Sequence, residues 1–349
     1  MTDSLPKFVD VFAELTAPAG LSPDRVRQVF DAIFAGAWTP AQIGGFLVAL
    51  RFAGENAETI AAAAAAMREA MVRVDHGFTR VLDTCGTGGD HSRTLNLSTG
   101  AALIAAATGV PVAKHGNRAA TSRSGSADVL EALGVPLDVP IASQAGILKQ
   151  GNIVFLFAQA HHPAMRHAGA VRRELGIRTL FNCLGPLANP AGATHQLIGT
   201  FDDAMRPVLA RALASLGTRR AWVVRSSDGM DEVSPYAPTR VTVVEAGRLE
   251  ELEIAPEDFG LSPSARGAVD GGDPGDNARA LEAVLRGEPH PASDAFVLNA
   301  AAALVVADGL EPRAAADRAR EALSSGRALA TLARWRELCR SAREGAASQ

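Results

Sequence analysis

The sequence predicts an α/β protein in which a small all-helical domain stands beside a larger domain with a mostly parallel central sheet flanked by helices. The first seventy-odd residues carry helical patterns and no strand pattern. After Gly77, short strand-like runs alternate with helical ones, which is typical of βαβ units. The length of 349 residues, of which 47% are apolar and 21% charged, is sufficient for two globular domains.

Helix start and stop signals divide the N-terminal segment. Ser22-Pro23 and Thr39-Pro40 each place a capping side chain before a proline at the first helical position. Gly36 and Gly54 follow as helix ends, and Asn56 can cap the next, alanine-rich helix. We therefore expect a helical domain over residues 1–73.

The larger domain is expected over residues 78–342, while a helical segment near 164–185 returns to the first domain. The expected strands are Val81 to Asp83, Val110 to Ala113, Ile153 to Phe157, His195 to Thr200 and Ala221 to Val224. Residues 240–245 and 249–254, on either side of Gly247, predict an added hairpin. The C-terminal third is expected to be helical, and the tail after about Arg343 to be disordered.

Composition and charge exclude several classes of protein. A net charge of -4 and a pI near 6.1 favour neither DNA nor RNA as a partner. Cys85, Cys183 and Cys339 are too few and too widely spaced for a disulfide framework, which indicates a reducing cytoplasm. The longest apolar stretch, residues 101–113, is too short and too broken to span a membrane.

A glycine-rich loop with the sequence DTCGTGGDHSRTLNLST occupies residues 83–99, directly after the first expected strand. Gly86, Gly88 and Gly89 allow backbone N–H groups to approach a bulky anion without interference from a Cβ atom. Asn96 and Ser98 then open a helix, whose N-terminus favours phosphate. Glycine content alone leaves an ordinary strand–turn–helix connection equally open.

A second loop with cationic and hydroxyl side chains follows the next expected strand and favours a binding site over solvated surface. Parallel strands place such loops at one edge of the sheet, where ligands usually bind in α/β folds. Cations and hydroxyls together suit a sugar that carries several phosphates. The side chains are Lys114, His115, Asn117, Arg118, Arg123, Ser122, Ser124 and Ser126.

Adjacent carboxylates follow the strand at Ala221 to Val224, in the segment DGMDEVSP. Asp231 and Glu232 could be two solvated acids in a turn. Beside two phosphate-binding loops they also suit Mg2+, which prefers a few carboxylates together with water and substrate phosphates. The sequence therefore predicts a magnesium site at this pair.

These segments form an ordered set that resembles the anthranilate phosphoribosyltransferase family over nearly the whole chain. The set comprises GTGGD at residue 86, NLST at 96, KHGN at 114, GSADVLEALG at 125, HHPAMRHAGAVRRELGIRTLFNCLGPLANPA at 161 and DGMDE at 228. The resemblance implies a helical domain beside an α/β domain, a homodimer formed through the helical domain, and Mg2+ as cofactor. At His91-Ser92-Arg93 the chain departs from the small residues common in that family.

The resemblance also implies which residues bind the substrates. Those expected to hold phosphoribosyl pyrophosphate are Gly86, Gly89, Asp90, Thr94, Asn96, Leu97, Ser98, Thr99, Lys114, His115, Gly116, Asn117, Arg118, Ala119, Ala120, Thr121, Ser122 and Ser126. Gly86, Asn117 and Arg172 are expected to face anthranilate. Ser98, Asp231 and Glu232 are expected to hold Mg2+.

The implied reaction transfers the phosphoribosyl group to the amine of anthranilate and expels pyrophosphate, as a step of tryptophan biosynthesis. An aryl amine is neutral at pH 7, so we expect electrostatic stabilisation and positioning, and no acid–base residue. Two alternatives remain. One is a pyrimidine nucleoside phosphorylase-like enzyme of the same fold, and the other is a non-catalytic paralogue that binds nucleic acid.

Overall fold

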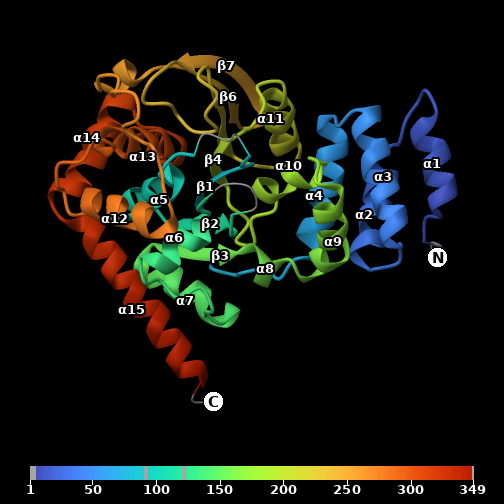
Figure 1. The fold of residues 1–349 in the computed structure, drawn as a ribbon, viewed down its shortest axis with the longest axis horizontal. Coiled ribbons are helices and arrows are strands. Elements are labelled where there is room, and N and C mark those ends of the chain that lie inside the picture. The colour runs from blue at the N-terminus through green and yellow to red at the C-terminus, as the bar shows by residue number, and fades with distance from the viewer. Residues whose placement is uncertain (1–4, 90–92, 120–122, 348–349) are drawn as a thin grey trace.

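The computed structural model describes residues 5–89, 93–119 and 123–347. A bundle of helices stands beside a body built on one seven-stranded sheet (Figure 1). The C-terminal helix projects from the far side of that body. The predicted fold class is confirmed.

Four helices form the bundle: α1 (Phe8–Thr16), α2 (Pro23–Phe34), α3 (Pro40–Ala53) and α4 (Ala57–Ala70). The expected start signals are confirmed, because the side chain of Ser22 accepts from the Arg25 N–H and that of Asn56 from the Thr59 N–H. Thr39 forms a reciprocal capping box with Gln42. These caps satisfy backbone donors that a helix start leaves open.

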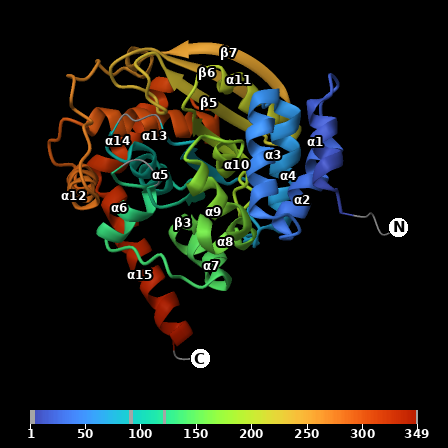
Figure 2. The same ribbon diagram turned by 45° about the vertical axis from the view of Figure 1, so that its right-hand side comes forward.

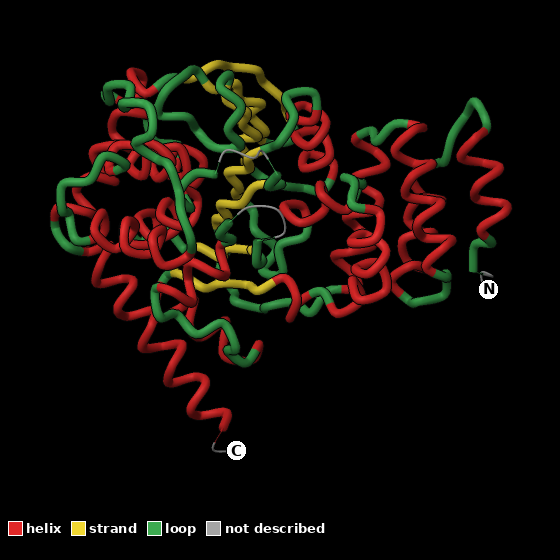
Figure 3. Tube along the Cα trace, in the orientation of Figure 1, coloured by secondary structure: helices red, strands yellow, loops and turns green. Residues whose placement is uncertain are grey.

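Seven strands lie in the order β3-β2-β1-β4-β5-β6-β7. The strands run through the middle of the larger body, with helices around them (Figure 3). Their bounds are β1 Leu82–Gly86, β2 Val112–Gly116, β3 Ile153–Phe157, β4 His195–Gly199, β5 Arg220–Ser226, β6 Thr239–Glu245 and β7 Arg248–Ile254. The first five are parallel, and β6 and β7 add an antiparallel hairpin. Ala246 and Gly247 turn that hairpin with φ values of 49° and 79°, as a tight two-residue connection requires.

The remaining helices pack around the sheet or against the bundle. They are α5 Leu97–Ala107, α6 Ser126–Ala132, α7 Ile141–Gly151, α8 Ala158–His161, α9 Arg166–Leu175, α10 Phe181–Leu187, α11 Met205–Ser215, α12 Pro274–Leu285, α13 Ser293–Asp308, α14 Pro312–Ser324 and α15 Arg327–Ala347, with short 3-10 turns at Pro163–Met165 and Pro256–Phe259. Helices α5 and α13 pack on one face, and α10 and α11 on the other. Helix α9 packs against α2 and α3 of the bundle, and α10 packs against both α4 and β2 (Figures 1 and 2).

The bundle shares its apolar core with one face of the sheet. Ile198 of β4 and Val223 of β5 belong to the same buried cluster as Phe30 of α2 and Phe181 of α10. A second cluster, on the α5 and α13 face, includes Trp335 of α15. The bundle is therefore anchored to the sheet by apolar packing.

The expected disorder after Arg343 is wrong, because α15 continues to Ala347. Alanine and arginine propagate a helix well once the earlier turns have docked on the core, here through Leu332 and Trp335. Among the described residues no single helix has the length and apolarity of a membrane span. Helices α13 and α14 reach that composition only as a pair bent by 117°.

The chain reverses its direction across the sheet between β1 and β4. It runs from β1 outward to β3, and then returns to the other side of β1 as β4. In open α/β sheets such a switch point leaves a crevice at the carboxyl ends of the strands. The glycine loop follows β1 at this position.

Candidate functional site

The glycine loop is tied to the loop that follows β4. The Thr87 N–H donates to the Gly199 carbonyl at 2.9 Å, and the Phe201 N–H donates to Thr87 Oγ1 at 3.0 Å. Gly88 and Gly89 have φ values of 64° and 81°, which glycine adopts without strain. The predicted loop therefore lies at the switch point of the sheet.

The glycine loop and the loop after β2 meet through Asn96. Its Nδ2 donates to the Ser124 carbonyl at 3.2 Å, and its Oδ1 accepts from Ser124 Oγ at 3.3 Å. Asn277 of α12 donates to the same Oδ1 at 2.9 Å. Asn96 occupies the N-cap position of α5, but its side chain joins the two loops and does not cap the helix. The two predicted loops thus line one region.

Lys114 lies beneath this region, only 2% exposed. Its ammonium donates to the Thr84 carbonyl and, at 3.3 Å, to Ser98 Oγ at the start of α5. Burial lowers the pKa of Lys114, and the nearby Asp83 carboxylate opposes that shift. Burial also raises the pKa of Asp83, whose carboxyl accepts from the His115 N–H at 3.1 Å and from Asn189 Nδ2 at 2.8 Å. A buried acid–base pair therefore underlies both loops.

Asp128 of α6 closes the second loop by accepting from the Ala119 and Gly125 N–H groups, both at 2.9 Å. The Arg118 guanidinium is directed onto α6, where it pairs with Asp128 at 3.1 Å and with Glu131 at 2.8 Å. Hydrogen bonds to both carboxylates hold the pKa of Arg118 well above its usual value. In this structure Arg118 therefore braces the outside of the loop.

The backbone of Asn117 anchors the start of α6. Its carbonyl accepts from the Ala127 N–H at 3.2 Å and from Ser126 Oγ at 3.3 Å. Gly116, at the end of β2, leaves room for Ser126 Oγ and the Phe155 ring, both of which a Cβ atom would overlap. Asn117 and Ser126, both predicted site residues, are therefore in contact.

His115 faces the interior. Its Nδ1 lies 3.0 Å from the Gly185 carbonyl, and its Nε2 lies 3.2 Å from Nε2 of His162. Burial, reinforced by the neighbouring histidines, lowers the pKa of His115 to about 3 and that of His162 to about 4. Both rings are therefore neutral at pH 7.

The acidic pair lies beside the glycine loop and the start of α5. Glu232 Oε1 accepts from the Ser98 N–H at 3.2 Å. The carboxylate of Asp231 lies against Gly86, since a Cβ built there would be 3.0 Å from Asp231 Oδ2. At Gly199 a Cβ would overlap the Asp231 carbonyl, so glycine is required for this approach. Glu232 therefore contacts Ser98 at the start of α5, and Asp231 lies against the ends of β1 and β4.

This donor set fits magnesium. Its ligands are two carboxylates and one hydroxyl, all of them hard oxygen donors. The set is not a metal site built from protein side chains alone, because within the described residues no group of three or more histidine, cysteine, aspartate or glutamate side chains could hold a metal. An ion here would complete its shell with water and substrate phosphate, which is the usual arrangement for Mg2+.

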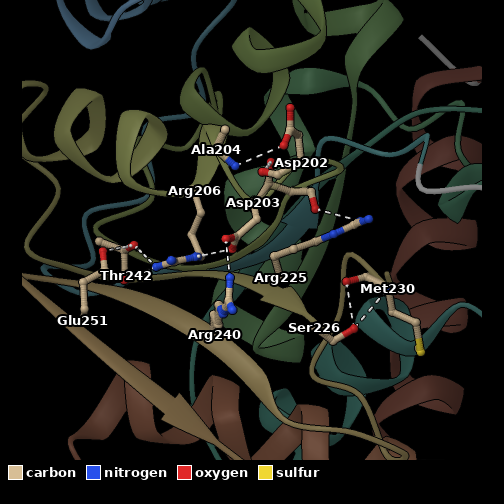
Figure 4. Close-up of polar contacts among 11 residues, drawn as sticks. Asp202, Asp203, Ala204, Arg206, Arg225, Ser226, Met230, Arg240, Thr242 and Glu251 are labelled. Carbon is tan, nitrogen blue, oxygen red and sulfur yellow. Dashed lines mark hydrogen bonds and ion pairs between the residues drawn. The ribbon is translucent and has the colours of Figure 1, made fainter. Parts of the chain in front are cut away.

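The turn before the acidic pair is held by short-range hydrogen bonds (Figure 4). The Met230 N–H donates to Ser226 Oγ at 3.0 Å within the turn. Outside the turn, Arg225 of β5 donates to the Thr200 carbonyl after β4 at 3.2 Å. The Asp228 carboxylate accepts from the hydroxyls of Ser226 and Ser234, the latter at 2.6 Å. Arg206, Asp203 and Arg240 form a separate ion network toward β6.

Arg172 of α9 lies on the bundle side of the site. Its Cζ is 5.4 Å from the centre of the Phe181 ring, and burial lowers the pKa of its guanidinium. No hydrogen bond or ion pair joins it to Gly86 or Asn117 in the described part of the chain. Asp90, Ala120, Thr121 and Ser122, together with His91 and Ser92, lie outside the described residues.

Two features at the site escaped the sequence reasoning. Arg178, just beyond α9, donates to the Gly89 carbonyl, and its Cζ is 3.9 Å from the centre of the Phe201 ring. Residues 269–271 pair with residues 93–95, through Leu95 N–H to the Val269 carbonyl at 2.8 Å. Arg178 lies within a motif already quoted, but no local pattern marks residues 269–271.

Comparisons with known proteins agree with this geometry. The family described as "Glycosyl transferase family, a/b domain" matches residues 79–329, and "Glycosyl transferase family, helical bundle domain" matches residues 9–71. An anthranilate phosphoribosyltransferase of Methylobacterium radiotolerans is 54% identical over 318 residues, which cover 90% of this chain and 92% of that protein. One of Rhodospirillum rubrum is 50% identical, with 90% of each chain covered.

Solved structures agree as well. The anthranilate phosphoribosyltransferase of Thermus thermophilus superposes with a TM-score of 0.88 at 41% identity, covering 95% of this chain and 99% of that one. The Saccharomyces cerevisiae enzyme, solved in complex with PRPP and Mg, also gives 0.88, at 29% identity and with 96% and 98% covered. The chain therefore belongs to the anthranilate phosphoribosyltransferase family.

Proposed function

We propose that this protein transfers the phosphoribosyl group of phosphoribosyl pyrophosphate to the amine of anthranilate, with release of pyrophosphate, in tryptophan biosynthesis. The observation that carries the proposal is the meeting of the glycine loop, the second loop and the acidic pair at one switch point. Relatives about half identical over nine-tenths of the chain support the same activity.

The proposed binding site for phosphoribosyl pyrophosphate combines backbone amides with a few fixed side chains. The glycine loop and the positive end of the α5 helix dipole lie at the switch point, where their polarity favours phosphate. Lys114 acts from below, since its ammonium orients Ser98 and the Thr84 carbonyl. Besides His115 and Arg118, the described residues of the proposed set are Gly86, Gly89, Thr94, Asn96, Leu97, Ser98, Thr99, Lys114, Gly116, Asn117, Ala119 and Ser126.

His115 and Arg118 act on this site indirectly in our proposal. The neutral His115 ring supports the end of β2 from within, through Gly185 and His162. Arg118 fixes the outside of the second loop through Asp128 and Glu131. Both therefore shape the loop, and their direct contact with phosphoribosyl pyrophosphate stays a prediction.

Ser98, Asp231 and Glu232 would hold Mg2+ together with the pyrophosphate. When bound, the ion supplies positive charge that stabilises the leaving pyrophosphate. The chain's own contribution is to fix these oxygen donors against α5 and β1, beside the glycine loop, where the charge develops. Asn117, Arg172 and the Gly86 backbone would orient anthranilate, whose neutral amine needs no base to attack C1 of the ribose.

We further propose a homodimer formed through the helical domain, with residues 1–73 and the returning segment near 164–185 as one domain and residues 78–342 as the other. Helix α1 exposes apolar side chains on the bundle surface, including Val9, which is 75% exposed, and Phe12, which is 43% exposed. Three free cysteines support a reducing, cytoplasmic setting.

Calorimetric titration with phosphoribosyl pyrophosphate, with and without Mg2+, tests the binding proposal. We expect tight binding only when Mg2+ is present. Anthranilate turnover, followed as loss of its fluorescence, then tests the reaction. Phosphorolysis of thymidine or uridine without anthranilate turnover would contradict the proposal and support a nucleoside phosphorylase.

A further inference from the structure

One buried polar side chain interrupts an otherwise apolar stretch of α13. Asn299 is fully buried, and its neighbours in the helix, from Phe296 to Leu304, are buried phenylalanine, valine, leucine and alanine. A carboxamide in such surroundings is destabilising unless its hydrogen bonds are made. Packing alone would favour leucine at this position, so the contacts of Asn299 need another explanation.

Those contacts go to the residue that follows the acidic pair. The Val233 N–H donates to Asn299 Oδ1 at 3.0 Å, and Asn299 Nδ2 donates back to the Val233 carbonyl at 3.0 Å. The second amide hydrogen is used within α13, on the Ala295 carbonyl at 3.0 Å. The two bonds to Val233 fix the peptide units on both of its sides, and one of these units joins it to Glu232.

Helix α13 also packs against α5, which carries the third proposed metal ligand. Gly100 of α5 lies so close to α13 that a Cβ atom there would overlap the Phe296 ring. Ser98 stands two residues before Gly100, and its N–H binds Glu232. One helix therefore contacts both halves of the proposed ligand set, α5 through Phe296 and the acidic loop through Asn299.

We infer that Asn299 is a positioning residue for magnesium. Its carboxamide holds the acidic loop at the distance from α5 at which Asp231, Glu232 and Ser98 can share one ion. This inference rests on the proposed function. Residues that orient metal ligands from behind typically change metal affinity by about 10- to 100-fold when they are replaced.

The test compares Asn299→Leu, which has nearly the same size but makes neither bond, with Asn299→Ser, whose hydroxyl can keep one. Leu304→Ala is the control, because it weakens the same buried helix on another face, about 1.4 turns away. Calorimetry measures the Mg2+ concentration needed for half-maximal binding of phosphoribosyl pyrophosphate. Amide hydrogen exchange measures protection of the Val233 N–H, and turnover is measured at saturating Mg2+.

We expect Asn299→Leu to raise the required Mg2+ concentration at least about tenfold and to lose protection at Val233. Asn299→Ser should be intermediate, and Leu304→Ala should match the wild type in both measurements. Turnover of Asn299→Leu should recover largely at saturating Mg2+.

A Mg2+ requirement within twofold of wild type in Asn299→Leu, or in Asn299→Ser if the leucine variant does not fold, would overturn the inference alone. Absence of Mg2+-dependent binding in the wild type would instead overturn the proposed function.

Discussion

The two loops that build the site are held in different ways. The acidic loop after β5 is fixed from the core, by both backbone groups of Val233 bonded to Asn299 and by the hydroxyls that surround Asp228. The glycine loop after β1 is fixed mainly at its rim, by Arg178 and by the strand-like pairing with residues 269–271.

The difference follows from what each loop would bind. A loop that binds an anion through backbone N–H groups cannot bury those groups in other hydrogen bonds, so it is supported from its carbonyls and its edges. The Arg178 contact fits this rule, because it uses the Gly89 carbonyl. The Thr87 and Leu95 N–H groups, which are bonded to the Gly199 and Val269 carbonyls, lie at the two ends of the loop. A metal loop contributes side chains, so its backbone is available for hydrogen bonds to the core.

The largest effect should come from removing both carboxylates of the acidic loop. We expect Asp231→Asn with Glu232→Gln to lower kcat/KM at least about 10³-fold, because a metal contributes several kcal/mol to charge stabilisation and each 1.36 kcal/mol is tenfold. Steady-state kinetics over a range of Mg2+ concentrations measures it. Glu250→Gln with Glu253→Gln, on the exposed part of β7, removes equal charge and should leave the rate unchanged. Normal magnesium dependence in the first variant would rule out the metal assignment.

A smaller effect is expected at Gly199, the last residue of β4, which both the glycine loop and the acidic loop contact. Gly199→Ala places a methyl group into the Asp231 carbonyl and should destabilise the fold by about 1–3 kcal/mol while weakening Mg2+-dependent binding. Thermal unfolding and calorimetry measure the two effects. Gly146→Ala in α7 is the control, since a methyl group there meets only the end of Gln150 at 4.0 Å and should be neutral or stabilising. Wild-type stability in Gly199→Ala would show that the acidic loop can shift freely.

Acidic pH should lower the stability of the protein through the buried histidines His115 and His162 at the end of β2. The pKa of His115 is about 3 and that of His162 about 4, below the value near 6.5 of an unfolded histidine. The unfolded chain therefore binds more protons between about pH 6.5 and 4, so this stability is complete above pH 6.5 and is lost as the pH falls. We expect a loss on the order of 2 kcal/mol per histidine by pH 5, measured by urea unfolding.

The raised pKa of Asp83 acts in the opposite direction, because a buried carboxyl that ionises less readily gains relative stability as the pH falls. His162→Asn removes one titrating ring and should flatten the loss between pH 7 and 5 without abolishing it. An equally steep loss in that variant would contradict the histidine explanation.

The smallest effect should appear at the rim of the glycine loop. Arg178→Ala is expected to raise KM for phosphoribosyl pyrophosphate about tenfold with little change in kcat, since charged hydrogen bonds contribute about 1.5–3 kcal/mol and the loop keeps its other attachments. Arg178→Lys should not restore KM, because lysine cannot stack flat on Phe201. Arg173→Ala, an exposed arginine of α9, is the matched control. A fall in kcat alone would place Arg178 in the chemical step instead.

Much of the fold followed from local patterns. Ser22, Thr39 and Asn56 cap their helices as expected, because a cap is decided within four residues of chain. The hairpin at Gly247 follows from turn chemistry in the same way. The predicted end of order near Arg343 failed because alanine and arginine continue the helix beyond the earlier turns of α15, which dock on the core.

The candidate site was only partly accessible to such reasoning. Glycine loops and an acidic pair are visible as residue types, and the structure brings Ser98 and Glu232 together. The directions of Arg118 and His115 were not visible, because their partners Glu131 and His162 are chosen by packing between separate elements.

By itself the sequence determined most helices and strands, and it marked the glycine-rich, cationic and acidic loops by their residue types, because these features depend on neighbours along the chain. Tertiary structure alone decided that β1 lies between β2 and β4, and that Asn299 reaches Val233 across 66 positions of sequence. Such contacts form only when distant elements bury their apolar faces together, and no local pattern encodes which faces will meet.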